Sequence, residues 1–522
     1  MKRLSGLFVA LSFLFSAPLF AATSTRVFTF HSGSDPDSLD PHLTSTVDGR
    51  NLFLQHFEGL LAFDHRDNSV KPGVAKRWTV SPDGRIYTFY LREAKWSDGT
   101  KITAHDFVYA WKRCLDPKTG CVTAARFDYL KNGRAYNAKK ITDVSQVGFR
   151  AIDDMTLELT LETPFPPILE LLTSPTYSPL KKDVVQKFGD KWTEPSHIVS
   201  NGPFVLKEYR IQDRIIFTKN PTYWDKDNVN LDEVHAHLIE DLETALKQFQ
   251  AGELDYIYQV PQTKAVVLQS DPLYHASPSF GTYYYPVNTK HPVLKDARVR
   301  RALAYAIDRQ TIVEKILRTG EKPAYGVIPP GVQGYTYKKY VDFDPAVAKK
   351  LLAEAGYPDG KGFPTLTLSY NTLDLHKLMA QTVQQMWREH LGINVVLQNH
   401  EWKVHIKSLQ SHSFEIARLG GIGEYIYPSG TLEEKTTQSP DNYAQFSNAE
   451  YDRTWEMAGK ETDPKKRLQL YAELEAILMN EMPDIPLFFY KNEWMTKSHV
   501  TGLSLSPMKS FNLKYVSLNG KR

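Results

Sequence analysis

The segment FEIARLGGIGEYIYP, residues 414–428, gives the strongest indication of how this chain folds. It begins with the alternation of apolar and polar residues that is typical of a β-strand. It continues with a cation, three glycines within four positions and a carboxylate: Arg418, Gly420, Gly421, Gly423 and Glu424. Glycines at this density leave the backbone without side chains, so that another backbone can approach it closely. We therefore expect a strand whose backbone is open to a second chain.

A strand of this kind suits the binding of an extended peptide. Its backbone offers N–H and C=O groups, while Glu424 can pair with an α-ammonium and Arg418 with a carboxylate. Six residues of extended chain span at most ~20 Å, which is about the length of a few peptide residues. The alternative is a glycine-rich bend inside a large sheet with two solvated charges, and the segment alone leaves that alternative open.

The first residues are typical of a secretory signal, which we place at residues 1–22. Lys2 and Arg3 precede an apolar run over 7–20, and small residues follow at Ala21 and Ala22. The run is short for a transmembrane helix. No cysteine follows it, so we expect no lipid anchor and predict an exported, soluble protein in a bacterial periplasm.

Composition excludes some partners and suggests others. Without Lys2 and Arg3 the chain has 61 basic and 60 acidic residues, a balance that argues against nucleic acid as a main partner. A chain of 522 residues exceeds a single hydrophobic core, so we expect two or three lobes. The 28 tyrosines, 26 phenylalanines and 9 tryptophans also suit a pocket that holds side chains, although many could be core.

Local patterns indicate mixed α/β structure. Thr103 and Asp106 form a capping box for a helix to about Arg113, and residues 155–161 alternate as a strand. Helical spacing is also present over 51–61. A strand at 365–370, a helix at 375–391 and a strand at 393–397 together predict a βαβ unit in a parallel sheet.

Patterns for enzyme and metal sites are weak. His400 and His405 flank Glu401 but are five residues apart, and so lie about 140° off a common helix face. We find no nucleophile elbow, phosphate loop or dinucleotide fingerprint, and expect no catalytic residue, metal or cofactor. Cys114 and Cys121 are separated by a turn sequence, which in an oxidising compartment predicts a disulfide between them.

Several segments, in the same order along the chain, carry a resemblance to a known family. They include SGSDPDSLDPH (32–42), FEGLLAFD (57–64), KPGVAKRW (71–78), YLREAKWSDGTKITAHDFVYAWKR (90–113), NGPFVLKEY, TYYYPVN, DARVRRALAYAIDR, LLAEAGY, LSYNTLDLHKL and NHEWK. With these segments the mature chain resembles the periplasmic oligopeptide-binding proteins of ABC importers. The resemblance implies an α/β, two-lobed periplasmic binding protein fold with a hinge between the lobes and an additional third α+β domain.

The resemblance also implies domain boundaries. Lobe one would comprise residues 23–57, 182–280 and 490–522. The third, small domain would comprise 58–181, and lobe two 281–489. The chain would cross twice between the lobes.

The resemblance also assigns site residues, each by its position in the family pattern. The family has an aspartate for the peptide ammonium where this chain has Glu424, and Arg418 and His376 would serve the carboxylate end. Trp402 matches a family tryptophan, and Val47 a backbone contact from lobe one. The ligand would pair with the backbone of Gly420, Gly421, Ile422 and Gly423.

We further expect Tyr490 and Tyr285 in the pocket, although 283–285 alternate, so that only one face can meet the ligand. His376 could instead be a capping or solvated histidine, and Trp402 a core residue.

Four departures from the family pattern concern ligand preference. Leu409 replaces a further arginine, which removes one carboxylate anchor. Gly421 replaces a tryptophan that lines a side-chain pocket, which either enlarges that pocket or weakens its hold on the ligand. Gly281 and Ile422 occupy the positions of a family disulfide.

The resulting expectation is a monomeric protein that captures short peptides and delivers them to an inner-membrane ABC permease complex without catalysis. A narrower ligand, such as a cell-wall peptide or a non-peptide solute, is the alternative. A secreted hydrolase on the same fold is a second alternative, which no motif supports.

Overall fold

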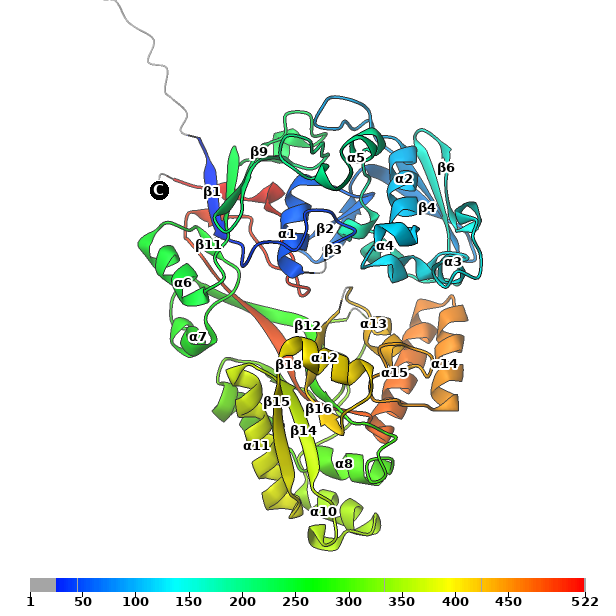
Figure 1. The fold of residues 1–522 in the computed structure, drawn as a ribbon, viewed down its shortest axis with the longest axis vertical. Coiled ribbons are helices and arrows are strands. Elements are labelled where there is room, and N and C mark those ends of the chain that lie inside the picture. Colours follow the sequence, from blue (N-terminus) through cyan, green and yellow to red (C-terminus); the bar gives the residue numbers. More distant parts are fainter. Residues whose placement is uncertain (1–24, 45, 333, 424, 521–522) are drawn as a thin grey trace, which may run out of the picture.

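The computed structural model describes residues 25–44, 46–332, 334–423 and 425–520. The secretory signal expected at 1–22 lies outside these residues. The described chain forms two bodies, one above the other, which two long strands connect (Figure 1). Within the described residues no helix combines the length and apolar character needed to cross a membrane.

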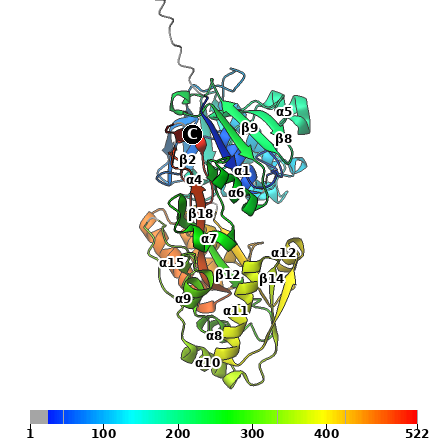
Figure 2. The same ribbon diagram turned by 90° about the vertical axis from the view of Figure 1, so that its left-hand side faces the viewer.

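One sheet of nine strands extends through both bodies. Its order is β17-β12-β18-β11-β1-β10-β9-β8, and β13 also pairs with β18. β12 (Tyr274–Pro286) and β18 (Asp484–Thr496) are antiparallel and run from the upper into the lower body (Figure 2). Their register is interrupted between Pro278 and Thr282 and again between Tyr283 and Tyr284. These are two connections between the bodies of the kind expected from the sequence.

The upper body contains the lobe-one part of this sheet and the helices around it. Its elements are β1 (Val27–His31), α1 (Val47–His56), α5 (Lys182–Phe188), β8 (Phe204–Arg210), β9 (Arg214–Lys219), β10 (Glu233–His237), α6 (Leu242–Ala251), β11 (Tyr256–Ile257), α7 (Gln262–Leu268), β19 (Val500–Thr501) and β20 (Ser517–Leu518). The expectation of a helix over 51–61 is wrong in its bounds. Thr46 caps α1 by accepting a hydrogen bond from the Gly49 N–H, and Phe57 is already extended.

The small domain lies beside lobe one in the same body. Its elements are β2 (Leu61–Asp64), β3 (Ser69–Pro72), β4 (Ala75–Val80), β5 (Ile86–Leu91), α2 (Ala104–Leu115), α3 (Gly133–Asn137), β6 (Phe149–Asp153), β7 (Thr156–Thr160) and α4 (Ile168–Leu171). The predicted capping box at the start of α2 is present, with the Thr103 N–H donating to Asp106 over 2.7 Å. A disulfide joins Cys114 at the end of α2 to Cys121.

The lower body is lobe two. Its helices are α8 (Ala297–Tyr305), α9 (Arg309–Thr311), α10 (Pro345–Glu354), α11 (Asp374–Leu391), α12 (Trp402–Gln410), α13 (Ser429–Leu432), α14 (Ala449–Lys460) and α15 (Pro464–Glu481). Its further strands are β13 (Lys322–Pro323), β14 (Leu366–Asn371), β15 (Val395–His400), β16 (Ile416–Ala417) and β17 (Leu419–Ile422). β14 and β15 are parallel and joined by α11, which confirms the predicted βαβ unit.

Buried apolar residues form separate cores in these parts. One core is confined to residues 280–488, one lies mainly within 53–192, and one combines residues from 28–258 with residues from 500–516. This separation supports the division that we propose: lobe one at 23–57, 182–280 and 490–522, the small domain at 58–181, and lobe two at 281–489.

Candidate functional site

The glycine-rich segment forms an edge of the nine-stranded sheet. β17 pairs antiparallel with β12, with Gly421 opposite Thr282 and Gly420 opposite Tyr283. No strand of the described chain pairs with the other side of β17. An edge strand presents unpaired N–H and C=O groups, so an extended ligand can add to the sheet here.

The two central glycines of β17 differ in what surrounds them. A Cβ atom on Gly420 would overlap the hydroxyl and ring of Tyr490, so only glycine allows that tyrosine to approach the strand. A Cβ atom on Gly421 would meet nothing within 4 Å, and Gly421 is exposed. The open space expected beside Gly421 is therefore present.

Arg418, directly before β17, is buried with an exposed fraction of 8%. Its Nη2 donates to the Tyr490 hydroxyl over 2.7 Å and its Nη1 to the Asn371 side chain over 3.2 Å. The guanidinium also lies over the Tyr283 ring, 4.7 Å from its centroid. Among the described residues it has no carboxylate partner, and its Nε is buried without a hydrogen-bond partner. A buried cation in this state favours the approach of an anion.

Two histidines flank Arg418. His376, on α11, is 4% exposed, and its Nδ1 lies 3.3 Å from the Tyr283 hydroxyl. Burial, with the charges of Arg418 and His405, lowers the pKa of His376 to about 3, so the ring is neutral near pH 7. A neutral His376 can donate a hydrogen bond to a carboxylate but adds no charge. His405 is also buried, and its Nε2 lies 2.8 Å from the Arg418 carbonyl oxygen.

The remaining predicted residues occupy different positions. Trp402 begins α12 and is 49% exposed, so it does not belong to the core. Val47 begins α1 on lobe one and is half-buried. Glu424 lies outside the described residues, so its predicted pairing with an ammonium stays a prediction.

The expectation for Tyr285 requires correction. Alternation along β12 turns Tyr283 and Tyr285 to the same face, and Tyr285 is 0% exposed with its ring 6.0 Å from that of Tyr283. Tyr285 therefore belongs to the core of lobe two. Tyr490, by contrast, is half-buried and in contact with Arg418, and Tyr284 on the opposite face of β12 lines a pocket.

That pocket lies between β17, β12 and the turn of helix that follows α13. It encloses about 490 Å³, part of it open to solvent, and its lining includes Gly421, Tyr284, Glu434, Lys435 and Asp484. Lys435 and Asp484 form a buried ion pair of 2.9 Å.

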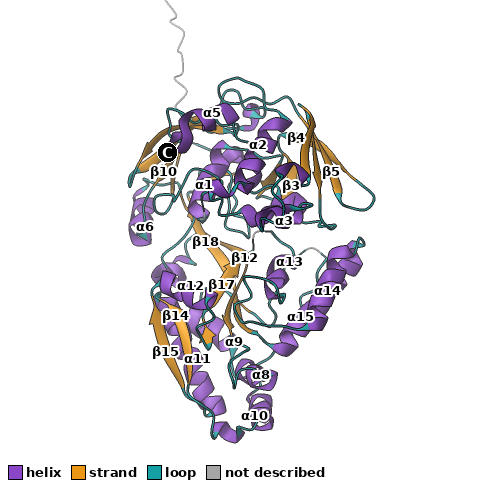
Figure 3. Cartoon of the chain, turned by 45° about the vertical axis from the view of Figure 1, so that its right-hand side comes forward, coloured by secondary structure: helices purple, strands orange, loops and turns teal. Residues whose placement is uncertain are grey.

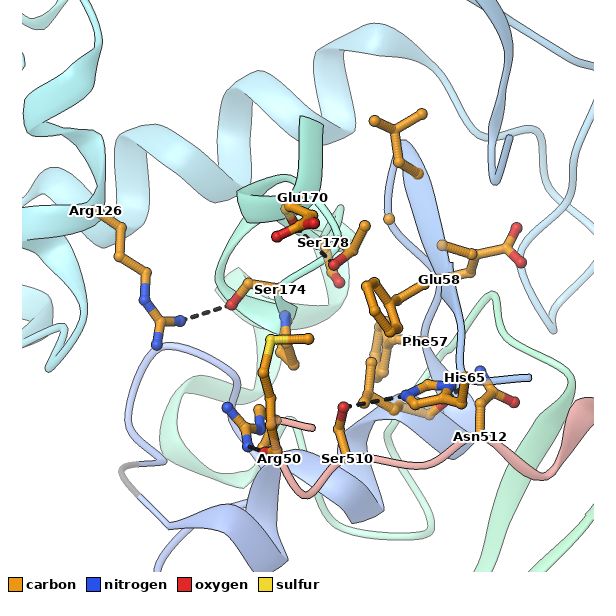
Figure 4. Close-up of a pocket in the computed structure, with 18 residues that line it drawn as sticks. Arg50, Phe57, Glu58, His65, Arg126, Glu170, Ser174, Ser178, Ser510 and Asn512 are labelled. Carbon is orange, nitrogen blue, oxygen red and sulfur yellow. Dashed lines mark hydrogen bonds between the residues drawn. The ribbon is translucent and has the colours of Figure 1, made fainter. Parts of the chain in front are cut away.

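A second pocket lies on the lobe-one side, between α1, β2, α4 and residues 508–512 (Figure 4). Arg126 lies on one wall and donates to Ser174 over 2.6 Å, while Arg50 lies on another and donates to the Met508 carbonyl over 2.8 Å. Glu58 points away from this pocket, toward Tyr223 and Trp224.

Comparisons with known proteins identify the family. The family model for bacterial extracellular solute-binding proteins, family 5, matches residues 69–443. This chain belongs to that family. Its relatives include the periplasmic oligopeptide-binding protein OppA of Salmonella typhimurium, 37% identical over 486 residues, which cover 90% of this chain and 88% of OppA.

Solved structures of the family share the fold. The Escherichia coli murein tripeptide-binding protein MppA matches with a TM-score of 0.82 and 34% identity over 95% of this chain and 99% of MppA. Haemophilus influenzae OppA in complex with the peptide RPPGFSPFR matches with a TM-score of 0.79 and 30% identity, over 95% of this chain and 99% of that protein. The two-lobed α/β solute-binding fold expected from the sequence is thereby confirmed.

The segment after β17 also connects this family member's lobe two to its small domain. The Tyr129 hydroxyl donates to Glu433 over 2.6 Å, and the Ile426 N–H donates to Glu170 over 2.8 Å. The Tyr425 ring packs edge-on against Phe165 at 5.8 Å. These contacts lie where α13 faces the small domain (Figures 1 and 3).

Sequence reasoning missed most of the charged residues around these sites. Those that the structure adds are Arg50, Arg126, Glu170, Glu433, Glu434, Lys435 and Asp484. Only Glu433, Glu434 and Lys435 are near the glycine-rich segment in sequence, and the open space at Gly421 is the signal that could have pointed to them.

Proposed function

We propose that this protein is the periplasmic component of an ABC-type oligopeptide importer. It captures short peptides between its two lobes and delivers them to an inner-membrane permease, and it performs no catalysis. The observation that carries the proposal is Arg418, a buried guanidinium without a carboxylate partner in the described chain, placed directly beside an edge strand of glycines.

The peptide backbone adds to the free side of β17 through main-chain hydrogen bonds. Its carboxylate end pairs with Arg418 and accepts a hydrogen bond from neutral His376. Glu424 pairs with the α-ammonium. Trp402 and Tyr490 contribute aromatic surface, and Val47 contributes a backbone contact from lobe one.

Closure of the two lobes completes the site. β12 and β18 are the hinge, because both strands run from the upper into the lower body and their pairing is interrupted between Pro278 and Thr282. The Tyr129–Glu433 and Ile426–Glu170 hydrogen bonds join the small domain to lobe two, and we propose that they stabilise the closed form.

The name of OppA favours oligopeptides as ligands, and the likeness to MppA supports a second candidate, a narrower ligand such as a murein peptide. Native mass spectrometry of protein purified from the periplasm distinguishes these. A heterogeneous set of short peptides supports the main proposal, and one defined mass supports the second. Turnover of added peptides, or a purified protein without any bound or bindable peptide, contradicts both.

The same spectra test export. Cleavage after Ala21 or Ala22, without a lipid adduct, is the expected mass of the mature chain. A chain that retains residues 1–22 in the periplasmic fraction would contradict the proposed signal.

A further inference from the structure

We propose that the pocket beside Gly421 selects a basic side chain of the bound peptide, with Glu434 as the specificity-determining residue. This inference rests on the proposed function, since it assumes that a peptide adds to the edge of β17. It goes further by naming the class of side chain that the pocket accepts.

The geometry of the sheet directs a ligand side chain to this pocket. Side chains of a strand alternate between the two faces of a sheet, and an added strand continues that alternation. Thr282, Tyr284 and Gly421 share one face, and all three line the pocket. Since a Cβ atom at Gly421 would meet nothing within 4 Å, the side chain of an added peptide that lies beside Gly421 on this face can extend past it into the pocket.

The charges in the pocket do not cancel. Lys435 is 4% exposed and Asp484 2% exposed, and their ion pair of 2.9 Å satisfies the only cation that lines the pocket among the described residues. Lys435 also lies over the Tyr284 ring, 4.9 Å from its centroid. Glu434 is a second carboxylate, 3.6 Å from the same ammonium, and its side chain is 43% exposed. One cation therefore faces two carboxylates, and the accessible carboxylate is Glu434.

The electrostatics of Glu434 agree with this assignment. The Glu434 side chain is partly desolvated in the pocket, and this desolvation, with the like charges of Asp441 and Asp484, outweighs Lys435 and raises the pKa of Glu434 to about 7. A ligand ammonium or guanidinium near Glu434 favours its ionised form. Binding of a basic peptide near pH 7 should therefore release part of a proton, whereas a neutral peptide should not.

Isothermal titration calorimetry with tripeptides tests the proposal. Lysine and glutamate are each placed at every position of trialanine. At one position we expect lysine to bind ~10-fold more tightly than glutamate, because the pocket attracts the first and repels the second. Titration in buffers of different ionisation enthalpy should show proton release for that lysine peptide alone.

Two variants and one control make the test specific. Glu434→Gln should reduce the lysine-to-glutamate ratio to ~1–2, because the accessible negative charge is gone. Gly421→Leu should abolish the preference for lysine over glutamate, because the leucine side chain fills the pocket. Glu473→Gln removes the same charge from an exposed position on α15 and should leave the ratio as in the parent.

The outcomes separate this inference from the proposed function. If tripeptides bind the parent with a ratio near one at every position, or if Glu434→Gln keeps the parent ratio, the pocket proposal is overturned and peptide binding stands. If no tripeptide binds the parent, both are overturned. A thermal melt of each variant shows that it is folded.

Discussion

Among the four buried arginines in the described part of lobe two, Arg309 and Arg418 differ in how their charge is accommodated. Arg309, at the start of α9, is 0% exposed and donates to three backbone carbonyls, those of Pro486, Ala304 and Ile307. Arg418 is 8% exposed and donates only to the side chains of Tyr490 and Asn371. Each guanidinium keeps one buried nitrogen without a hydrogen-bond partner, Nη2 in Arg309 and Nε in Arg418. The difference is that backbone carbonyls surround Arg309, whereas side chains orient Arg418 beside the edge strand β17.

These surroundings distinguish a structural buried cation from a ligand-binding one. A buried charge is tolerated when fixed dipoles such as carbonyls surround it. A buried guanidinium that side-chain hydroxyl and amide groups orient, but no carboxylate neutralises, is destabilising until an anion arrives. Substitutions at the two positions should therefore affect different properties.

Arg418→Met should have the largest effect on binding. Loss of the cation leaves a desolvated peptide carboxylate without its partner, which should weaken binding by ~2–5 kcal/mol. The same change removes an unneutralised charge, so the free energy of unfolding should change little or rise. Calorimetry and urea denaturation measure the two quantities. A variant that binds trialanine as the parent does would place the carboxylate anchor elsewhere.

Arg309→Met should have the opposite profile. Three buried carbonyls lose their donor, and we expect the free energy of unfolding to fall by ~3 kcal/mol. Peptide affinity of the folded fraction should stay close to that of the parent, because Arg309 does not line either pocket described above. Equal losses of peptide affinity in both arginine variants would contradict the assignment of Arg309 as structural and Arg418 as ligand-binding.

The two glycines beside Arg418 test how Tyr490 orients its guanidinium. Gly420→Ala places a methyl group where the Tyr490 hydroxyl lies, and should displace that tyrosine from Arg418 at a cost of ~1–3 kcal/mol in stability. Gly421→Ala is the matched control, since its methyl group meets open space. Thermal melts of the two variants give the measurement, and indistinguishable melts would contradict the close approach of Tyr490.

How much of this could be predicted from sequence depends on whether the partners are local. Arg418 and the glycines lie within a few residues, so their pattern was readable, as was the capping of α2 by Thr103 and Asp106. Tyr490, which orients Arg418, comes from a strand 72 positions away. Asp484, which neutralises Lys435, is similarly remote. No local pattern encodes such pairs.

Tyr285 illustrates a second limit. Alternation assigns residues to two faces of a strand, but it does not say which face the core covers. In β12 the core covers the face of Tyr283 and Tyr285, because that face packs with Phe488 and its neighbours. The predicted helix bounds of 51–61 were also wrong. The helical spacing did not reveal that Thr46 caps the helix, so that α1 begins at Val47 and ends at His56.

Tyr129→Phe tests the contact between the small domain and lobe two. The change removes the hydrogen bond to Glu433 but keeps the ring that stacks on Phe165 at 4.0 Å. Glu433 would lose a donor in a partly buried place, so the closed form should be destabilised by ~1 kcal/mol. Small-angle scattering with a subsaturating peptide should show a larger radius of gyration than in the parent. An identical radius at equal occupancy would show that this contact does not hold the closed form.

The smallest expected effect concerns the pH dependence of stability through His376. Its pKa in the folded protein is lowered to about 3, chiefly by burial, whereas an unfolded histidine titrates near 6.5. Below pH ~6.5 the unfolded chain therefore binds a proton that the folded chain does not, and stability falls as the pH decreases toward 3.

His376→Gln removes this one contribution, so the difference in unfolding free energy between variant and parent should shift in favour of the variant from pH 7 to pH 4. Urea denaturation at a series of pH values measures that difference. A pH-independent difference for His376→Gln would show that the ring is protonated in the folded state, and His376 would then add a second positive charge beside Arg418.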